Sequence, residues 1–228
     1  MKNIAIIPAR SGSKGIKDKN IKLLNNKPLL AYTIEAAIKS EIFDEIMVST
    51  DSEKYATIGK QYGANVPFLR EDKLSGDNAS SWDVVKDTLW KYKQVDIKFD
   101  NVVLLQPTSP LRDYQDIIDS YSLFINKNAN TVVSVCEMEH SPLWSNTIPA
   151  DLSMEKFFKS NYSMINRQKI NTFYRINGAI YIVNINYLLN NNDIYSKKSF
   201  AYLMPKNKSI DIDDDFDFEL AKYFINSK

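Results

Sequence analysis

The hydrophobic residues of this chain fall into short continuous runs that alternate with amphipathic stretches. Continuous apolar runs bounded by polar turns predict buried strands, whereas apolar positions three or four residues apart predict helices. The expected strands cover residues 3–8, 45–50, 66–69, 101–106, 131–137, 177–184 and 200–205. The expected helices cover residues 28–40, 52–62, 79–93, 114–126 and 216–226. Because strands alternate with helices, we predict a three-layer α/β fold with a mostly parallel sheet covered on both faces.

This alternation is interrupted between residues 141 and 176, where aromatic and polar residues are mixed without a clear period. Such a density of aromatic side chains outside the sheet favours an interface over a long surface connection. We therefore expect one domain, residues 1–228, in which 141–176 is an inserted segment for dimerisation that also covers a substrate. The aromatic residues of the segment are Trp144, Phe157, Phe158, Tyr162, Phe173 and Tyr174.

Composition and charge narrow the range of partners. With 44% apolar residues, 25% charged residues and a formal net charge of +1, the chain has no overall field that would attract nucleic acid or a membrane surface. The N-terminal apolar run, residues 4–8, is too short for a signal-peptide core, and no run is long enough to span a bilayer. A single cysteine suits a reducing compartment, so a cytoplasmic location is expected.

The scarcity of histidine and cysteine excludes several kinds of chemistry. The chain contains one histidine, His140, and one cysteine, Cys136, which rules out a zinc site built on these ligands. At the end of an expected strand the two share a face but lie too far apart to hydrogen-bond. Nothing around His140 resembles the nucleophile elbow of a Ser–His–Asp enzyme. The chemistry is therefore expected to rest on carboxylates, cationic side chains and a metal ion.

A basic, glycine-containing loop, residues 9–20, follows the first expected strand. Gly12 and Gly15 allow backbone N–H groups to approach an anion closely. In an open α/β sheet, ligands bind beyond the carboxyl ends of the strands, which is where this loop lies. The loop fits neither the Walker A pattern nor the dinucleotide fingerprint. Its positive charge nevertheless favours a site for a nucleoside triphosphate over a basic loop that is merely solvated. Its charged residues are Arg10, Lys14, Lys17 and Lys19, against one acid, Asp18.

A second candidate site lies near the C-terminus, where apolar and acidic residues alternate over 210–213. In an extended segment this spacing places Asp211 and Asp213 on one face, opposite two isoleucines. Two carboxylates on one face, close to phosphates, are suitable ligands for Mg²⁺. The acids that follow them, Asp214, Asp215 and Asp217, favour instead the N-terminus of the last helix.

Five segments in one order, residues 9–20, 49–51, 104–112, 174–181 and 210–213, resemble the acylneuraminate cytidylyltransferase family, the CMP-sialic acid synthetases. The resemblance runs over nearly the whole chain. It implies a nucleotide-binding, Rossmann-like α/β domain with a dimerisation insertion. The implied reaction joins CTP and a nine-carbon 2-keto sugar acid, giving a CMP-sugar and pyrophosphate. The implied cofactor is Mg²⁺, with Mn²⁺ as an alternative.

The resemblance also implies roles for single residues. The triphosphate loop corresponds to Arg10, Ser13, Lys14 and Lys19, followed by Asn20 at the ribose. Arg70 and Ser81 match positions that read cytosine, whose acceptors a guanidinium and a hydroxyl can satisfy. The sugar acid would be held by Gln106, Arg175, Asn177 and Tyr181, with Arg167 lent to the site of a neighbouring subunit. Asp211 and Asp213 match the metal-binding and proton-accepting pair, and together with Arg10 and Lys19 form the implied catalytic set.

Two departures from the family pattern leave the identity of the sugar acid undetermined. Ile176 stands where many relatives have proline, and Trp144 stands where sialate-specific members carry a basic residue. Legionaminic acid is therefore an alternative to N-acetylneuraminic acid. Three other activities also stay open: a glycosyltransferase that uses the Asp-x-Asp pattern, a non-catalytic CTP sensor, and a cytidylyltransferase for the eight-carbon 3-deoxy-octulosonate.

Overall fold

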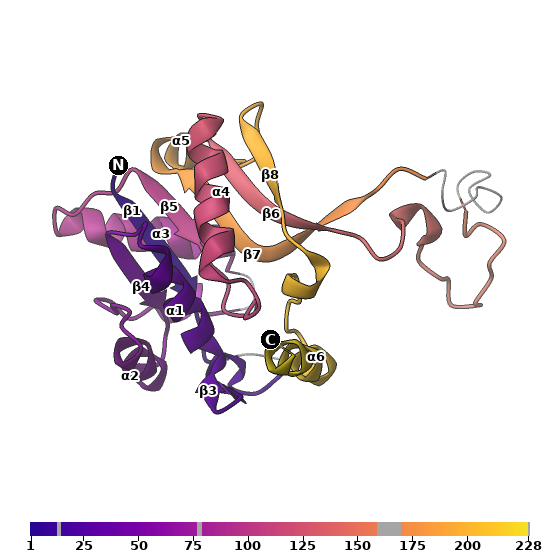
Figure 1. The fold of residues 1–228 in the computed structure, drawn as a ribbon, viewed down its shortest axis with the longest axis horizontal. Coiled ribbons are helices and arrows are strands. Elements are labelled where there is room, and N and C mark those ends of the chain that lie inside the picture. Colours follow the sequence, from indigo (N-terminus) through magenta and orange to yellow (C-terminus); the bar gives the residue numbers. More distant parts are fainter. Residues whose placement is uncertain (13–14, 77–78, 159–169, 228) are drawn as a thin grey trace.

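A central β-sheet organises the computed structural model, which describes residues 1–12, 15–76, 79–158 and 170–227. Within these residues six strands form one sheet in the order β4-β1-β5-β7-β6-β8 (Figure 1). The strands are β1 Asn3–Pro8, β4 Glu45–Ser49, β5 Asn101–Leu104, β6 Thr131–Glu137, β7 Tyr174–Asn184 and β8 Ser199–Leu203. β1 is parallel to β4 and β5, and β6 is parallel to β8, whereas β7 is antiparallel to both its neighbours. The mostly parallel sheet expected from the sequence is confirmed, with β7 as its reversed strand.

Helices cover both faces of the sheet, as the alternation of elements predicted. They are α1 Leu29–Ser40, α2 Glu53–Gln61, α3 Ser81–Gln94, α4 Tyr114–Asn126 and α5 Ile185–Asn190. The last helix, α6 Asp215–Asn226, packs outside these layers in a separate apolar cluster with Leu24 and Leu29. Ala5 and Ile7 of β1 belong to a core shared with α1, α2 and α4, while Ile4 and Ile6 belong to a core shared with α3 and α5. Successive strand residues thus bury opposite faces, which produces the three layers. Among the helices of the described ranges, none combines the length and apolarity needed to cross a bilayer.

The structure also corrects the expected elements at a few places. Residues 66–69 form no strand; only an isolated bridge, Met47 to Asn65, joins this segment to the sheet. Pro67 explains the difference, because it cannot donate to a strand ladder. A small hairpin, β2 Leu23–Leu24 and β3 Lys27–Pro28, was not predicted. The short helix α5 and the 3-10 helices η1 Lys19–Ile21, η2 Asp72–Leu74, η3 Pro142–Trp144 and η6 Lys206–Lys208 were also not predicted.

An arm leaves the body of the molecule beyond β6 and returns into β7 (Figure 1). Its described parts, residues 138–158 and 170–173, form little regular structure apart from η3. Tyr174 and Ile176 at the start of β7 are half exposed, at 50% and 49%. The interruption of the α/β alternation is thus visible as a projecting segment, and its role in dimerisation stays a prediction. Tyr162 and Arg167 lie outside the described residues.

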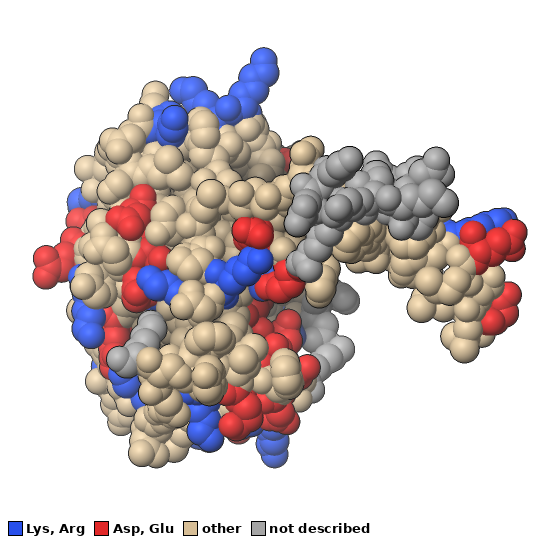
Figure 2. Space-filling view, turned by 45° about the vertical axis from the view of Figure 1, so that its right-hand side comes forward, with Lys and Arg blue, Asp and Glu red and all other residues tan. Residues whose placement is uncertain are grey.

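The order of the strands positions a crevice. From β1 the chain crosses to β4 on one side, and β5 lies on the other side of β1. Such a reversal separates the loops at the carboxyl ends of two neighbouring strands and leaves room for a ligand. The loops that leave β1 and β5 therefore flank the candidate site. On the face drawn in Figure 2 basic and acidic side chains are interspersed, in agreement with the formal net charge of +1.

Candidate active site

A cavity of about 440 Å³ opens at the carboxyl ends of β1 and β5. It brings together segments from the beginning, middle and end of the chain. Two cations of the basic loop, Arg10 and Lys19, line it together with the acidic segment and the exit of β5. Its lining includes Arg10, Gly15, Lys19, Asn20, Arg70, Ser81, Gln106, Thr108, Asp211 and Asp213. Most of the site residues proposed from the sequence thus surround one space.

The basic loop packs directly against the acidic segment. A Cβ atom on Gly15 would collide with the backbone carbonyl of Asp213, so only glycine permits this approach. Ile16 is buried with Ile212 in a small apolar cluster beneath the contact. Asn20, predicted to contact ribose, is buried and donates from Nδ2 to the Arg10 carbonyl oxygen at 3.1 Å, which holds the two ends of the loop together. Ser13 and Lys14 lie outside the described residues.

Lys19 lies at the meeting point of the two segments. Its Nζ donates to the Ile212 carbonyl oxygen at 2.5 Å and lies 3.2 Å from Oδ1 of Asp213. The Lys19 side chain is only 12% exposed, whereas that of Asp213 is 81% exposed. The η1 helix, which starts at Lys19, fixes the stem of this side chain while its ammonium faces the cavity. A cation so placed can stabilise negative charge on a phosphate in the cavity.

Asp211 and Asp213 both line the cavity, as alternation predicted, although residues 209–213 are not part of a strand. Ile212 between them is fully buried, and its N–H donates to the Thr108 carbonyl oxygen at 2.9 Å. The burial of Asp211 raises the pKa of its carboxyl group, and Asp213 adds to the effect, while a hydrogen bond from Thr108 and the charge of Lys19 oppose it. The exit of β5 therefore fixes the position of the acidic pair.

The acidic pair fits a hard divalent cation. Asp211 Oδ1 is buried and has no hydrogen-bond partner, which is costly for a carboxylate unless a cation or a proton satisfies it. Within the described part of the chain, no group of three or more His, Cys, Asp or Glu side chains could hold a metal by itself. Two carboxylates with phosphate and water oxygens are nevertheless a common ligand set for Mg²⁺.

Arg70 forms the opposite wall of the cavity. Its guanidinium donates to the hydroxyl of Ser49 at 3.2 Å and to the carbonyl oxygen of Ser49 at 2.5 Å, so the exit of β4 orients it. Burial lowers its pKa to about 10, against the opposing charge of Asp51. Ser81, also in the lining, starts α3, whose N-terminus is capped by Ser80 in a capping box. The two predicted base-reading residues thus reach the same space, Arg70 from a loop held by the exit of β4 and Ser81 from the start of α3.

A second cavity of about 500 Å³ adjoins the first and shares Ser81 and Gln106 with it. Gly178 lies beside Gln106 and has a φ of +75°, in the region that L-residues other than glycine rarely adopt. Glycine is therefore required where β7 passes Gln106. Burial, with the neighbouring Tyr195 and Asp211, raises the pKa of Tyr181 to about 12. An aromatic wall made of Trp82, Tyr181 and Tyr195 lines the cavity, with the first two rings edge to face at 5.9 Å.

Two residues predicted to contact the sugar, Asn177 and Arg175, are not in the lining of the two cavities. Asn177 is only 1% exposed, and its amide is used inside the protein: Oδ1 accepts from Ser134, and Nδ2 donates to Ser209 at 2.9 Å. These partners hold the amide from within β7, and its contact with the sugar acid stays a prediction. Arg175 is partly exposed and donates to the Ser209 carbonyl oxygen at 3.1 Å, and it is not in the lining of either cavity. Arg167 lies outside the described residues.

Sequence reasoning missed some residues that shape the site. Thr108 contacts Asp211 by a side-chain hydrogen bond, and Trp82 supplies part of the second cavity. Asp51 accepts two hydrogen bonds from Ser11 in the basic loop. A signal existed for Asp51 and Thr108, because they lie one and two residues beyond expected strands whose carboxyl ends meet at the site. No pattern pointed to Trp82, which reads as an ordinary helix residue.

Comparisons with known proteins agree with this geometry. A family model described as cytidylyltransferase matches residues 4–225. The chain is 44% identical over 220 residues to an N-acylneuraminate cytidylyltransferase of Escherichia coli, covering 96% of this chain and 51% of that protein. It is 39% identical over 226 residues to a CMP-N,N′-diacetyllegionaminic acid synthase of Legionella pneumophila, covering 97% and 95%. The chain thus spans about half the length of the first relative and nearly all of the second.

A solved structure shares the fold at low sequence identity. It is described as CMP:2-keto-3-deoxy-manno-octonic acid synthetase complexed with CTP, and superposes with a TM-score of 0.75 over 100% of this chain and 99% of that one. Its sequence identity is 14%, so the likeness supports the arrangement of strands and helices alone.

Proposed function

The chain belongs to the cytidylyltransferase family, and we propose that it transfers the cytidylyl group of CTP to a nine-carbon 2-keto sugar acid. The two relatives described above are named for N-acylneuraminate and for N,N′-diacetyllegionaminic acid, both sugar acids of this class. The observation that carries the proposal is the pair of adjoining cavities that share Ser81 and Gln106. Two spaces that meet at common residues suit two substrates that must react with each other.

The first cavity suits CTP. Arg10 and Lys19 line this cavity and supply positive charge for the triphosphate. In the structure Lys19 contacts Asp213 of the acidic pair. Arg70 and Ser81 face the same space and can donate to the carbonyl and ring-nitrogen acceptors of cytosine. Ser13 and Lys14 are assigned to the same triphosphate by resemblance. Asn20, whose side chain is bound to the Arg10 carbonyl, orders the loop beside the ribose position.

The second cavity suits the sugar acid. Its aromatic wall can pack against the apolar parts of an acylated sugar, and Gln106 lies at its boundary with the first cavity. A sugar there would present its anomeric hydroxyl toward the phosphates. Arg175 and Arg167 are the cations assigned by resemblance to its anionic end, and Tyr181 lines the wall. N-acetylneuraminate and legionaminate are the two leading candidates.

The reaction is an in-line displacement at phosphorus. The anomeric 2-hydroxyl oxygen forms a bond to the α-phosphorus of CTP, the bond from that phosphorus to the bridging oxygen breaks, and pyrophosphate leaves. The hydroxyl proton passes to a carboxylate oxygen of Asp211 or Asp213, directly or through water. Lys19 and Arg10 offset the charge that shifts onto the leaving phosphates.

Asp211 and Asp213 would hold Mg²⁺, with Mn²⁺ as an alternative. When held there, the ion would neutralise phosphate charge and would lower the pKa of the attacking hydroxyl. The unpartnered Oδ1 of Asp211 supports this role.

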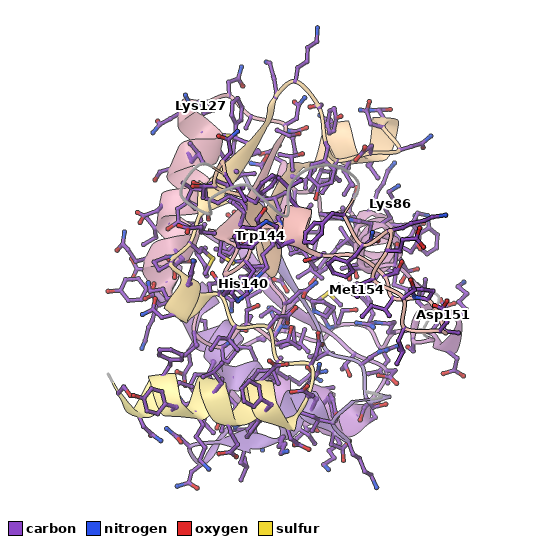
Figure 3. The ribbon with its side chains drawn as sticks, turned by 90° about the vertical axis from the view of Figure 1, so that its right-hand side faces the viewer. Lys86, Lys127, His140, Trp144, Asp151 and Met154 are labelled. Atoms are coloured by element: carbon purple, nitrogen blue, oxygen red, sulfur yellow. The ribbon has the colours of Figure 1, made fainter. Side chains whose placement is uncertain are left out.

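We further propose a homodimer in which the inserted segment expected from the sequence, residues 141–176, completes the neighbouring sugar site with Arg167. Several large apolar side chains of the arm are exposed, among them Leu152 at 75%. Figure 3 views the arm from its outer side, with Trp144, Asp151 and Met154 on it in front of the body. Exposed apolar groups gathered on one projection are typical of a protein interface. The cytoplasmic location expected from the single cysteine stays a prediction.

The decisive experiment measures pyrophosphate release from CTP with a panel of keto sugar acids. Turnover with N-acetylneuraminate or N,N′-diacetyllegionaminate supports the proposal and identifies the sugar. Turnover only with the eight-carbon 3-deoxy-octulosonate would replace the proposed substrate class. Tight CTP binding without turnover on any acid would indicate a sensor, and transfer from a ready-made nucleotide sugar would indicate a glycosyltransferase.

A further inference from the structure

The basic loop needs an anchor on the side away from the acidic segment. Its described part carries Arg10, Lys17 and Lys19, whose like charges repel one another, and only η1 at its end is regular structure. A loop that binds phosphates well must hold its cations in place before the ligand arrives, because ordering them on binding would cost affinity. The question is which residues hold this loop.

One anchor lies at the start of the loop. The Asp51 carboxylate accepts from the Ser11 backbone N–H at 2.8 Å through Oδ1 and from the Ser11 hydroxyl at 2.7 Å through Oδ2. Burial opposes ionisation of Asp51, but these hydrogen bonds outweigh it and its pKa lies below the ordinary value. Asp51 therefore stays charged and holds both donors of Ser11.

The other anchor lies at the end of the loop. The Tyr55 hydroxyl donates to Oδ1 of Asp18 at 3.0 Å, and the ring of Tyr55 is only 1% exposed within the core. Asp18 has a φ of 53°, in the left-handed region that costs a non-glycine residue free energy. From this conformation its carbonyl oxygen accepts from the N–H groups of Ile21 and Lys22, at 3.0 Å each. These bonds close the turn that carries Lys19.

Both anchors come from one rigid element. Asp51 follows β4, Ser52 caps α2 by accepting from the Tyr55 N–H, and Tyr55 lies in the first turn of the helix. The exit of β4 also orients Arg70, through Ser49, and receives the Ala9 N–H at 2.9 Å. One junction between strand and helix thus sets the position of the loop and of the wall opposite it.

We propose that Asp51 and Tyr55 form a two-point clamp that holds the basic loop at Ser11 and Asp18 and so positions Lys19 for the triphosphate. Both are positioning residues, because they act through the loop and are not in the lining of the cavity. The proposal rests on the proposed function for its ligand, CTP. The clamp itself is a property of the protein without ligand, so it can also be tested in that state.

The test compares Tyr55→Phe with a matched control, Tyr92→Phe. Tyr92 is also a buried tyrosine whose hydroxyl donates to a carboxylate, that of Glu45, at 2.7 Å, and it is not in the lining of either cavity. Each substitution removes one oxygen and keeps the ring, so the two variants should lose similar thermal stability. We expect Tyr55→Phe to weaken CTP binding by about fivefold, the effect of one net hydrogen bond, and Tyr92→Phe to leave it unchanged. Asp51→Asn should weaken binding at least as much.

Two further measurements separate positioning from general loosening. In a Lys19→Ala background, Tyr55→Phe should weaken CTP binding by less than twofold, because its effect passes through Lys19.

Without nucleotide, trypsin should cleave after Lys17 about fivefold faster in Tyr55→Phe than in Tyr92→Phe, as mass spectrometry of the fragments would reveal. Equal CTP affinity and equal cleavage in the two tyrosine variants would overturn the clamp. Failure of the parent protein to bind CTP would instead overturn the proposed function, and the cleavage comparison would still decide the clamp.

Discussion

The ammonium group of Lys19 lies 3.2 Å from the carboxylate of Asp213, although the two residues are 194 positions apart in the chain. The pair joins the loop after β1 to the segment before α6, and the Lys19 side chain is largely enclosed while that of Asp213 is open to solvent. An ion pair with one exposed partner contributes little to stability. Either residue can therefore exchange its partner for a phosphate oxygen or a metal ion at low cost.

Lys19→Ala should lower turnover by roughly a hundredfold or more, as the loss of one donor to a developing charge does. The fold should persist, because Lys19 lies at the edge of the cavity and the loss is limited to one weak ion pair and one hydrogen bond to the Ile212 carbonyl oxygen. The measurement is pyrophosphate release at saturating CTP, with circular dichroism as the check on folding. A folded variant with nearly normal turnover would remove Lys19 from the mechanism.

Asp211→Asn and Asp213→Asn should each lower activity and raise the Mg²⁺ concentration needed for half-maximal rate, since an amide is a poorer ligand than a carboxylate. The effect should be larger for Asp211, whose buried Oδ1 has no protein partner. Titration of activity with Mg²⁺ and with Mn²⁺ provides the measurement. Asp215→Asn, on the solvent side of the α6 N-terminus, is the matched control and should titrate like the parent.

Arg70→Ala should reduce the preference for CTP over UTP as well as CTP affinity, because it removes a donor from the cavity wall. The quantity to compare is kcat/KM for the two nucleotides, measured with the same sugar acid. Arg70 also hydrogen-bonds to Ser49, so thermal unfolding should accompany the kinetics. An unchanged CTP to UTP ratio in a folded variant would mean that cytosine is read by other residues.

Asn177→Ala should destabilise the protein by about 2–4 kcal/mol, because it leaves buried partners such as Ser134 and Ser209 without their hydrogen bonds. Urea unfolding gives this value directly. If Asn177 instead contacted the sugar, the variant would keep its stability and lose sugar affinity, which would contradict the buried placement.

Mixing Lys19→Ala with Arg167→Ala should restore activity if the protein is a dimer with shared sites. Each mixed dimer would then have one site with both lesions and one with neither. Partial dissociation and reassociation of the two inactive variants, followed by an activity assay, tests this. If Arg167 served its own subunit, every site would keep one lesion and the mixture would stay inactive. A monomer at micromolar concentration, seen by sedimentation, would also exclude the shared site.

The sequence by itself determined most of the secondary structure and the place of the proposed nucleotide site. The apolar run of β1 and the amphipathic period of α1 depend on neighbouring residues, so they could be read locally. The basic loop could be placed because ligands bind beyond the carboxyl ends of strands in this fold class. The alternation over 210–213 correctly paired Asp211 with Asp213, even without a strand, because burial of Ile212 imposes the same orientation.

Only the tertiary structure decided which distant segments meet. Four features depend on residues that are far apart in the chain. They are the reversed direction of β7, the burial of Asn177, the contact of Thr108 with Asp211 and the hydrogen bond between Tyr55 and Asp18. A polar residue such as Asn177 has the same local pattern whether it faces a ligand or the interior. Its environment is set by packing and hydrogen-bond satisfaction over the whole fold, and neither is encoded in the spacing of its neighbours.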